Sequence, residues 1–214
     1  MLRLQIVVGS TREGRSADLV VPWVVQHAKE HGGFAVELLD LRDWVLPLFA
    51  EHAGTIGDWA DPTYSEPVVR RWNHKIAEGE AYLFITSEYN HSMPGALKNA
   101  IDNVFASLAF RGKPAGFIGY SAGISAGVRA VEHLASVAIE AELVPMRNSV
   151  LIPQVAQSMA GGVPKDPTTG IALTILLEDL AWWGKLLAAG RAEGMLPPGA
   201  TRLRAMMAAG APTR

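Results

Sequence analysis

The feature that most constrains the fold of this chain is a repeated alternation of short apolar runs with longer segments of helical periodicity. The short runs are rich in Val, Ile, Leu, Phe and Ala. The first run, residues 2–8, is apolar and β-branched and ends at Gly9, which is typical of a strand buried on both faces. The predicted strands cover residues 2–8, 34–39, 81–86, 115–120 and 144–152.

Helical segments separate and follow these strands. After Ser16, which suits an N-cap, Leu19, Val20, Trp23 and Val24 recur at helical spacing until a Gly-Gly pair ends the pattern. Ser65 is the predicted cap of a second helix that reaches residue 76, after an irregular stretch over residues 41–64. Further helices are predicted over residues 94–107, 128–138 and 171–189.

Strands that alternate with helices imply right-handed crossovers, and therefore a parallel sheet covered by helices on both faces. We predict an α/β fold, a three-layer, doubly wound, five-stranded parallel sheet with strand order 2-1-3-4-5. A length of 214 residues suits one domain of this kind. The predicted domain covers residues 1–190, and residues 191–214, rich in Ala, Gly, Pro and Arg, form a partly ordered tail.

Composition excludes several classes of protein. Hydrophobic residues make up 49% of the chain and charged residues 19%, a balance typical of a well-buried globular protein. A formal charge of -2 argues against a nucleic-acid partner, and the absence of cysteine excludes disulfides and thiolate sites. Because the apolar runs are too short for a membrane helix or a signal peptide, we expect a soluble, cytoplasmic protein.

The loops after strands 1, 3 and 4 are the expected ligand site, because ligands bind beyond the carboxyl ends of the strands in open α/β sheets. In the order 2-1-3-4-5 these three strands are neighbours. The first loop offers hydroxyls, guanidinium groups and helix N-terminal N–H groups that suit a phosphate dianion, although it matches neither common nucleotide motif. The alternative is a flexible loop with solvated arginines. The polar residues in question are Ser10, Arg12, Arg15 and Ser16.

The third-strand loop, residues 87–95, reads Ser-Glu-Tyr-Asn-His-Ser-Met-Pro-Gly. Its polar side chains beside an aromatic suit a planar heterocycle, while the alternative is a long connection built from turn-forming residues. The fourth loop, Gly-Tyr-Ser-Ala-Gly, lets a ligand approach the backbone and also matches the nucleophile elbow of serine hydrolases. In these hydrolases an acidic residue and then a histidine follow the serine in the chain. Here His133 is the only histidine after Ser121, and Glu132 is the only carboxylate between them, so the catalytic triad cannot be completed in that order.

Three segments together resemble the NAD(P)H-dependent FMN reductase family, whose flavodoxin-like members include quinone, azo-dye and chromate reductases. They are Gly-Ser-Thr-Arg-Glu-Gly-Arg, then Glu-Tyr-Asn-His-Ser-Met-Pro-Gly-Ala-Leu-Lys-Asn-Ala-Ile-Asp, then Gly-Lys-Pro-Ala-Gly-Phe-Ile-Gly-Tyr-Ser-Ala-Gly. The resemblance covers most of residues 2–152. It implies a flavodoxin-like fold and a homodimer or homotetramer that holds FMN noncovalently near a subunit interface.

The resemblance also implies roles for individual residues. The FMN phosphate would be held by Ser10, Arg12, Arg15 and Ser16. The isoalloxazine would be lined by Glu88, Tyr89 and Asn90, with backbone groups of residues 87–90 near its reactive edge, and on the other side by Ser121, Ala122 and Gly123. Ser87 stands where the family usually has Pro, and Ser121 where it often has Gly, so both departures fall in the flavin site.

The expected function is that of an FMN-dependent oxidoreductase that takes hydride from NADPH or NADH and reduces a second acceptor, such as free flavin or a quinone, by ping-pong kinetics. No catalytic acid, base or metal is assigned. The alternatives are a flavodoxin-like electron carrier, which a near-neutral charge disfavours, and a protein that senses a phosphorylated ligand. Trp182 and Trp183, in an apolar helix, are expected in the core or in a subunit interface.

Two further pairs have simple interpretations. His27 and His31 have metal-ligand spacing on one helix face, but no third ligand accompanies them, so we predict no metal site. Lys98 and Asp102 form an i, i+4 pair that is either a surface salt bridge or part of a subunit contact.

Overall fold

The apolar runs form one parallel sheet in the computed structural model, which describes residues 1–57 and 61–210. The strands are β1 (Leu2–Val8), β2 (Phe34–Asp40), β3 (Ala81–Ser87), β4 (Pro114–Tyr120) and β5 (Val144–Ile152). All neighbouring strands pair in parallel in the order β2-β1-β3-β4-β5. The predicted sheet and its strand order are therefore confirmed.

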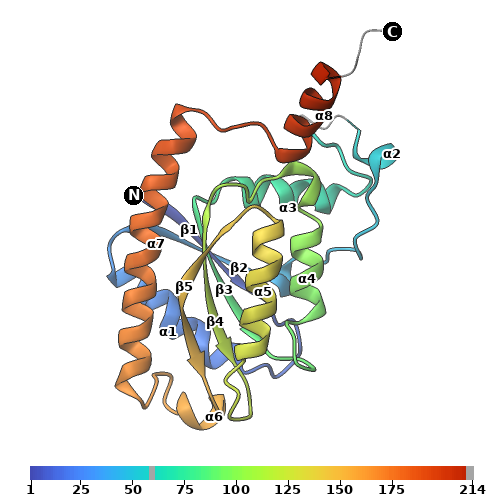
Figure 1. Ribbon diagram of the computed structural model, residues 1–214. Coiled ribbons are helices and arrows are strands. Elements are labelled where there is room, and N and C mark those ends of the chain that lie inside the picture. The colour runs from blue at the N-terminus through green and yellow to red at the C-terminus, as the bar shows by residue number, and fades with distance from the viewer. Residues whose placement is uncertain (58–60, 211–214) are drawn as a thin grey trace.

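Helices cover both faces of the sheet, which explains why its central strands β3 and β4 are mostly apolar. Every residue of β3 and β4 is buried. One face packs against α1 (Ala17–Glu30) and α7 (Pro167–Glu193), and the other against α3 (Pro67–Ala77), α4 (Gly95–Asp102) and α5 (Val128–Glu140). Figure 1 shows α1 and α7 to the left of the sheet and α4 and α5 to its right. The three-layer architecture is as predicted.

Some helix boundaries differ from the prediction. The N-cap of α3 is Glu66, not Ser65, because the backbone N–H and hydroxyl of Ser65 both donate to Glu51 Oε1. The helix predicted over residues 94–107 ends early. The side-chain amide of Asn103 donates to the carbonyl of Asn99 at 2.9 Å, and a separate 3₁₀ turn, η2 (Phe105–Ser107), follows.

Short helices lie in stretches predicted as irregular. The segment after β2 contains η1 (Leu41–Asp43) and α2 (Ala53–Ile56), although residues 58–60 of that stretch lie outside the described residues. A single-turn helix, α6 (Val155–Ser158), follows β5. None of these had a periodic pattern long enough to predict them.

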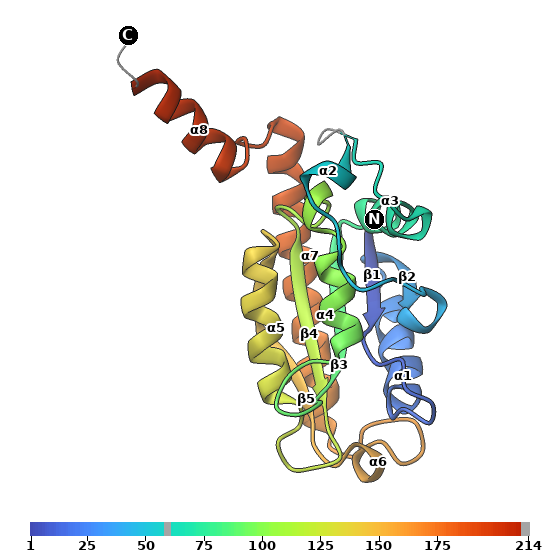
Figure 2. The ribbon, with the colours of Figure 1, turned by 90° about the vertical axis from the view of Figure 1, so that its right-hand side faces the viewer.

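The C-terminal region is more helical than predicted. The last sheet-covering helix, α7, extends to Glu193, and α8 (Gly199–Gly210) forms most of the expected tail; residues 211–214 lie outside the described ones. Figure 2 shows α8 pointing away from the three layers. Trp182 and Trp183 are 61% and 37% exposed, so the expectation that they belong to the core is wrong. Among the described helices, none has both the length and the apolar character needed to cross a membrane.

Candidate functional site

A hollow lies at the carboxyl ends of β1, β3 and β4. The sheet register aligns Val8 with Ile85 and Ser87 with Tyr120, so the loops after these strands leave from the same edge. All the residues predicted to contact FMN, except Asn90 and Gly123, line this hollow, together with Tyr120 and Val155. The predicted convergence of the three loops is therefore observed.

Two glycines allow the loops to turn tightly at this edge. A Cβ on Gly9 would lie 2.8 Å from Leu97 Cδ2, closer than real Cβ atoms approach. Gly127 has φ +81°, and a Cβ there would lie 2.6 Å from the backbone nitrogen of Tyr120. Side chains at either position would push the first or the fourth loop away from the strand ends.

Arg15 is buried beneath the first loop, with only 6% of its surface exposed. Its guanidinium pairs with both oxygens of Asp40, donates to Asp18 Oδ1 at 2.8 Å and donates to the carbonyl of Ser10 at 2.5 Å. Hydrogen bonding to Asp40 raises the pKa of Arg15 further above its ordinary value. Burial is the largest single influence on Asp40 and opposes its ionisation, but hydrogen bonds from Arg15 and from the Arg42 backbone, together with the two guanidinium charges, outweigh it and lower the pKa of Asp40. Arg15 therefore shapes the first loop, with its charge balanced by carboxylates.

Arg12 and Ser10 present different groups to the hollow. Arg12 is exposed, and its guanidinium carbon lies 6.0 Å from the ring centroid of Tyr89. The hydroxyls of Ser10 and Tyr89 lie 2.7 Å apart in a hydrogen bond that joins the first and third loops. Since Arg15 is balanced by Asp40 and Asp18, Arg12 is the guanidinium better placed to meet an anion.

The third loop makes a tight two-residue turn. Tyr89 and Ser92 exchange backbone hydrogen bonds of 2.8 and 3.0 Å, and Asn90 and His91 both have positive φ, 49° and 67°. This is the pattern of a type I′ turn, which favours Asn. Asn90 is exposed in this turn and does not line the hollow, so its visible role is to shape the turn that presents Glu88 and Tyr89.

Three buried polar atoms around the hollow have no hydrogen-bond partner among the described residues. They are Ser87 Oγ, Glu88 Oε2 and Tyr120 OH. Burial raises the pKa of Tyr120, which keeps its phenol neutral. An unpaired buried polar group costs about 1–3 kcal/mol. Their grouping at one hollow indicates a polar ligand there. Tyr120 was not predicted as a site residue, and its only sequence signal is its place at the end of a strand, directly before Ser121.

Ser121 lacks the partner that a nucleophile needs. Its hydroxyl donates to the carbonyl of Gly123 at 2.9 Å. Nδ1 of His133, the only histidine that follows it in the chain, lies instead 3.0 Å from Ser92 Oγ. The Gly-Tyr-Ser-Ala-Gly match is thus a strand-to-helix loop, in which the Gly123 carbonyl accepts the Ser121 hydrogen bond without lining the hollow itself.

The remaining candidates have local partners. His27 Nε2 lies 3.3 Å from Thr174 Oγ1, and His31 Nδ1 accepts from the backbone N–H of Gly33 at 3.2 Å. Within residues 1–57 and 61–210, no group of three metal-ligating side chains occurs. Lys98 Nζ lies 2.6 and 2.7 Å from the two carboxylate oxygens of Asp102, as the i, i+4 spacing predicted.

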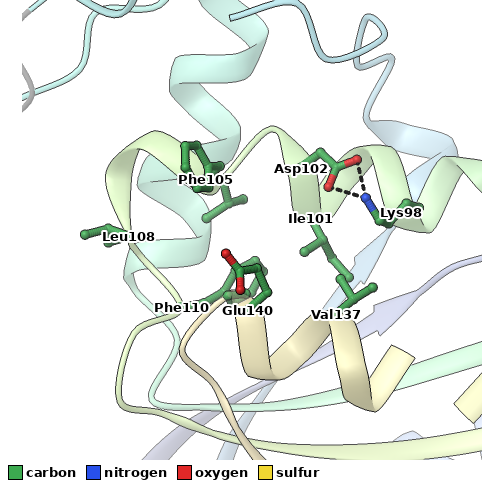
Figure 3. Close-up of a pocket in the computed structure, with 10 residues that line it drawn as sticks. Lys98, Ile101, Asp102, Phe105, Leu108, Phe110, Val137 and Glu140 are labelled. Carbon is green, nitrogen blue, oxygen red and sulfur yellow. Dashed lines mark hydrogen bonds and ion pairs between the residues drawn. The ribbon is translucent and has the colours of Figure 1, made fainter. Parts of the chain in front are cut away.

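A second pocket lies near the amino ends of the strands, between η2 and the C-terminal end of α5. Figure 3 shows Phe105, Leu108 and Phe110 on one side, Val137 on the other, and the Lys98–Asp102 ion pair at the rim. Its walls are mainly apolar, and its polar groups do not converge on one point. The hollow at the carboxyl ends of the strands, which the three loops line, is therefore the stronger candidate for a polar ligand.

Comparisons with known proteins show what the chain is similar to. The family model for NADPH-dependent FMN reductase matches residues 2–157, which include all three loops. An NAD(P)H-dependent FMN reductase of Pseudomonas aeruginosa is 35% identical over 130 residues, 59% of this chain and 64% of that protein. The chain thus spans less than two thirds of that relative's length.

Two other similar proteins extend the comparison. A 2-hydroxy-1,4-benzoquinone reductase of Burkholderia sp is 31% identical over 148 residues, 68% of this chain and 74% of that protein. The structure of FerB, a flavoenzyme NAD(P)H:(acceptor) oxidoreductase of Paracoccus denitrificans, superposes with a TM-score of 0.66 at 28% identity. It covers 86% of this chain and 98% of FerB.

Proposed function

The chain belongs to the NADPH-dependent FMN reductase family, and on that premise we propose that it binds FMN in the hollow and oxidises NAD(P)H to reduce a second acceptor. The observation that carries the proposal is the hollow itself. Hydroxyls, the exposed guanidinium of Arg12 and three buried polar atoms without a partner among the described residues meet there, at loops within the part of the chain that the family model matches. These groups fit a ligand with a phosphate at one end and a polar-edged ring at the other.

The phosphate end of FMN fits the first loop. Arg12 and the hydroxyl of Ser10 face the hollow, and the first turn of α1 begins there. Ser16 occupies the N-cap position without a side-chain capping bond, so its hydroxyl remains available to an anion at the start of α1. Arg15 contributes by fixing the Ser10 carbonyl, which differs from a direct phosphate contact.

The ring end of FMN fits the third and fourth loops. Ser87, Glu88 and Tyr89 lie on one side, and Ser121 and Ala122 on the other. When bound, FMN supplies the redox chemistry, accepting two electrons from NAD(P)H and passing them on. The chain's residues bind and orient the ring, and the buried Tyr120 and Ser87 hydroxyls supply hydrogen bonds at its floor. No side chain is required as acid or base.

The acceptor and the assembly are part of the same proposal. We expect a quinone or a free flavin as acceptor, since the relatives include a benzoquinone reductase and FMN reductases. We expect a homodimer or homotetramer, because Trp182, Ile171 and Leu186 on α7 are all more than half exposed. A cytoplasmic location remains a prediction. The electron-carrier, ligand-sensor and hydrolase alternatives are not favoured by these findings.

Cofactor identity provides the first experimental test. The purified protein, reconstituted with excess FMN and then desalted, should retain one FMN per chain and show a flavin absorption spectrum. Riboflavin, which lacks the phosphate, should be lost under the same conditions. Retention of neither flavin would contradict the proposal.

A further inference from the structure

Arg129 lies beside the hollow, at a position where an isolated cation is unfavourable. It is the second residue of α5, and a helix N-terminus carries partial positive charge. Its side chain pairs with a carboxylate that compensates for this. Nε donates to Glu88 Oε1 at 2.7 Å, a second guanidinium nitrogen contacts the same oxygen, and that nitrogen also donates to Ser125 Oγ at 2.8 Å.

Glu88 depends on this pair more than Arg129 does. The Glu88 side chain is only 6% exposed, against 37% for Arg129, and its Oε2 has no partner among the described residues. A carboxylate buried to this extent is unfavourable unless a cation compensates for it. Glu88 also lines the hollow, so the charge of this pair acts on whatever ligand lies there.

The same helix holds the other end of the turn. His133, one helical turn after Arg129, lies with its Nδ1 3.0 Å from Ser92 Oγ. Arg129 thus contacts Glu88, the residue before the turn, and His133 contacts Ser92, the last residue of the turn. The other charged side chains that line the hollow are Arg12 and Arg15, and Arg15 is already balanced by Asp40 and Asp18. The Glu88–Arg129 pair is therefore a separate ion pair at this site, whose charge balance a single substitution removes.

We infer that Arg129 is a positioning residue that neutralises Glu88 and thereby sets the reduction potential of the FMN in the hollow. The inference rests on the proposed function. Hydride transfer from NAD(P)H moves two electrons and one proton, so the flavin gains one negative charge and the nicotinamide one positive charge. An uncompensated carboxylate beside the ring opposes that gain, and an uncompensated guanidinium favours it.

Opposite changes in potential follow from this charge argument. Arg129→Met leaves Glu88 uncompensated and should lower the potential. Glu88→Gln leaves Arg129 uncompensated and should raise it, and the double variant should lie close to the wild type. We expect each single change to alter the ratio of the affinities for reduced and oxidised flavin about tenfold, which equals about 30 mV for a two-electron couple.

The experiment is an anaerobic redox titration of each FMN-loaded variant against a dye of known potential, together with titration of oxidised FMN into the apoprotein. Arg111→Met is the matched control, since it breaks an Arg–Glu pair with Glu142 that does not line the hollow. Its potential should equal that of the wild type. Arg129→Lys keeps the charge and should stay near the wild-type potential. If Arg129→Met does not fold, Glu88→Gln still tests the inference, because it alone should raise the potential.

The outcomes separate the inference from the proposed function. Wild-type protein that binds no FMN would refute the proposed function. Protein that binds FMN, but whose Arg129→Met and Glu88→Gln variants shift the potential in the same direction or leave it unchanged, would overturn the inference alone. An Arg129→Lys variant whose potential moves as far as that of Arg129→Met would overturn it too, because the charge at this position is then not what matters. A shift of the same size in Arg111→Met would also overturn it.

Discussion

Replacing Arg12 by Ala should weaken FMN binding while leaving riboflavin binding almost unchanged. Arg12 is exposed at the hollow and makes no buried ion pair, unlike Arg15. A hydrogen bond to a charged partner contributes about 1.5–3 kcal/mol. Because Arg12 gives up part of its contact with the Tyr89 ring, a contact of about 0.5–1 kcal/mol at an exposed site, the net loss should fall in the lower part of that range.

We therefore expect a loss of about 1.5–2 kcal/mol, which raises Kd for FMN by roughly 10- to 30-fold. The assay is quenching of flavin fluorescence, with FMN and riboflavin each titrated into wild type and Arg12→Ala. The two proteins and two ligands form a thermodynamic cycle, so the coupling between Arg12 and the phosphate is read directly. Arg147→Ala, which removes an exposed arginine that does not line the hollow, is the control.

Equal losses for FMN and riboflavin would refute the reasoning, because the effect would then not depend on the phosphate. Arg15→Ala should behave differently from Arg12→Ala. It leaves Asp40 and Asp18 without their shared cation, so it should lower the unfolding temperature as well as the flavin affinity. Unchanged thermal stability in Arg15→Ala would contradict the structural role assigned to this residue.

Three further predictions concern pH, Ser121 and assembly. The folded-state pKa of Asp40 lies below its ordinary value of about 3.9, so its contribution to stability is present above that pH and is lost as the pH falls further. Urea unfolding measured from roughly pH 5 down to roughly pH 2 should thus show a smaller loss of stability in Asp40→Asn than in wild type. Ser121→Ala should keep the rate of NAD(P)H oxidation within roughly tenfold of wild type, which is the scale of one neutral hydrogen bond, and should shift the flavin affinity or the flavin absorption. Ser121-dependent esterase activity in flavin-free protein would contradict this. Light scattering at micromolar concentration should give a dimer or tetramer mass, and a monomer would refute the assembly expected from the exposed apolar residues of α7.

The fold could be predicted from sequence because it depends on local pattern. Each strand is a mainly apolar run, and the two covering layers follow from the burial of both faces, as in β3 and β4. The convergence of the loops also follows, since parallel strands end at one edge. Boundaries were predicted less well where a distant side chain decides them, as Glu51 does for Ser65.

Within the site, pairings between distant residues could not be predicted. Asp40 lies 25 residues from Arg15, and Arg129 lies 41 residues from Glu88, so neither pair leaves a local pattern. Asn90 was predicted as a ligand residue from its motif, whereas its positive φ explains its place in the turn. Sequence reasoning therefore predicted that these loops converge, but not the charges that balance each other around the hollow.

Anaerobic reduction of the bound flavin is the most direct measurement of the central claim. The FMN-loaded protein, mixed with a small excess of NADPH or NADH in the absence of oxygen, should lose its flavin absorption within seconds. Addition of a benzoquinone should then restore it. Flavin absorption that persists with both nucleotides, in protein shown to hold one FMN per chain, would contradict the proposed activity.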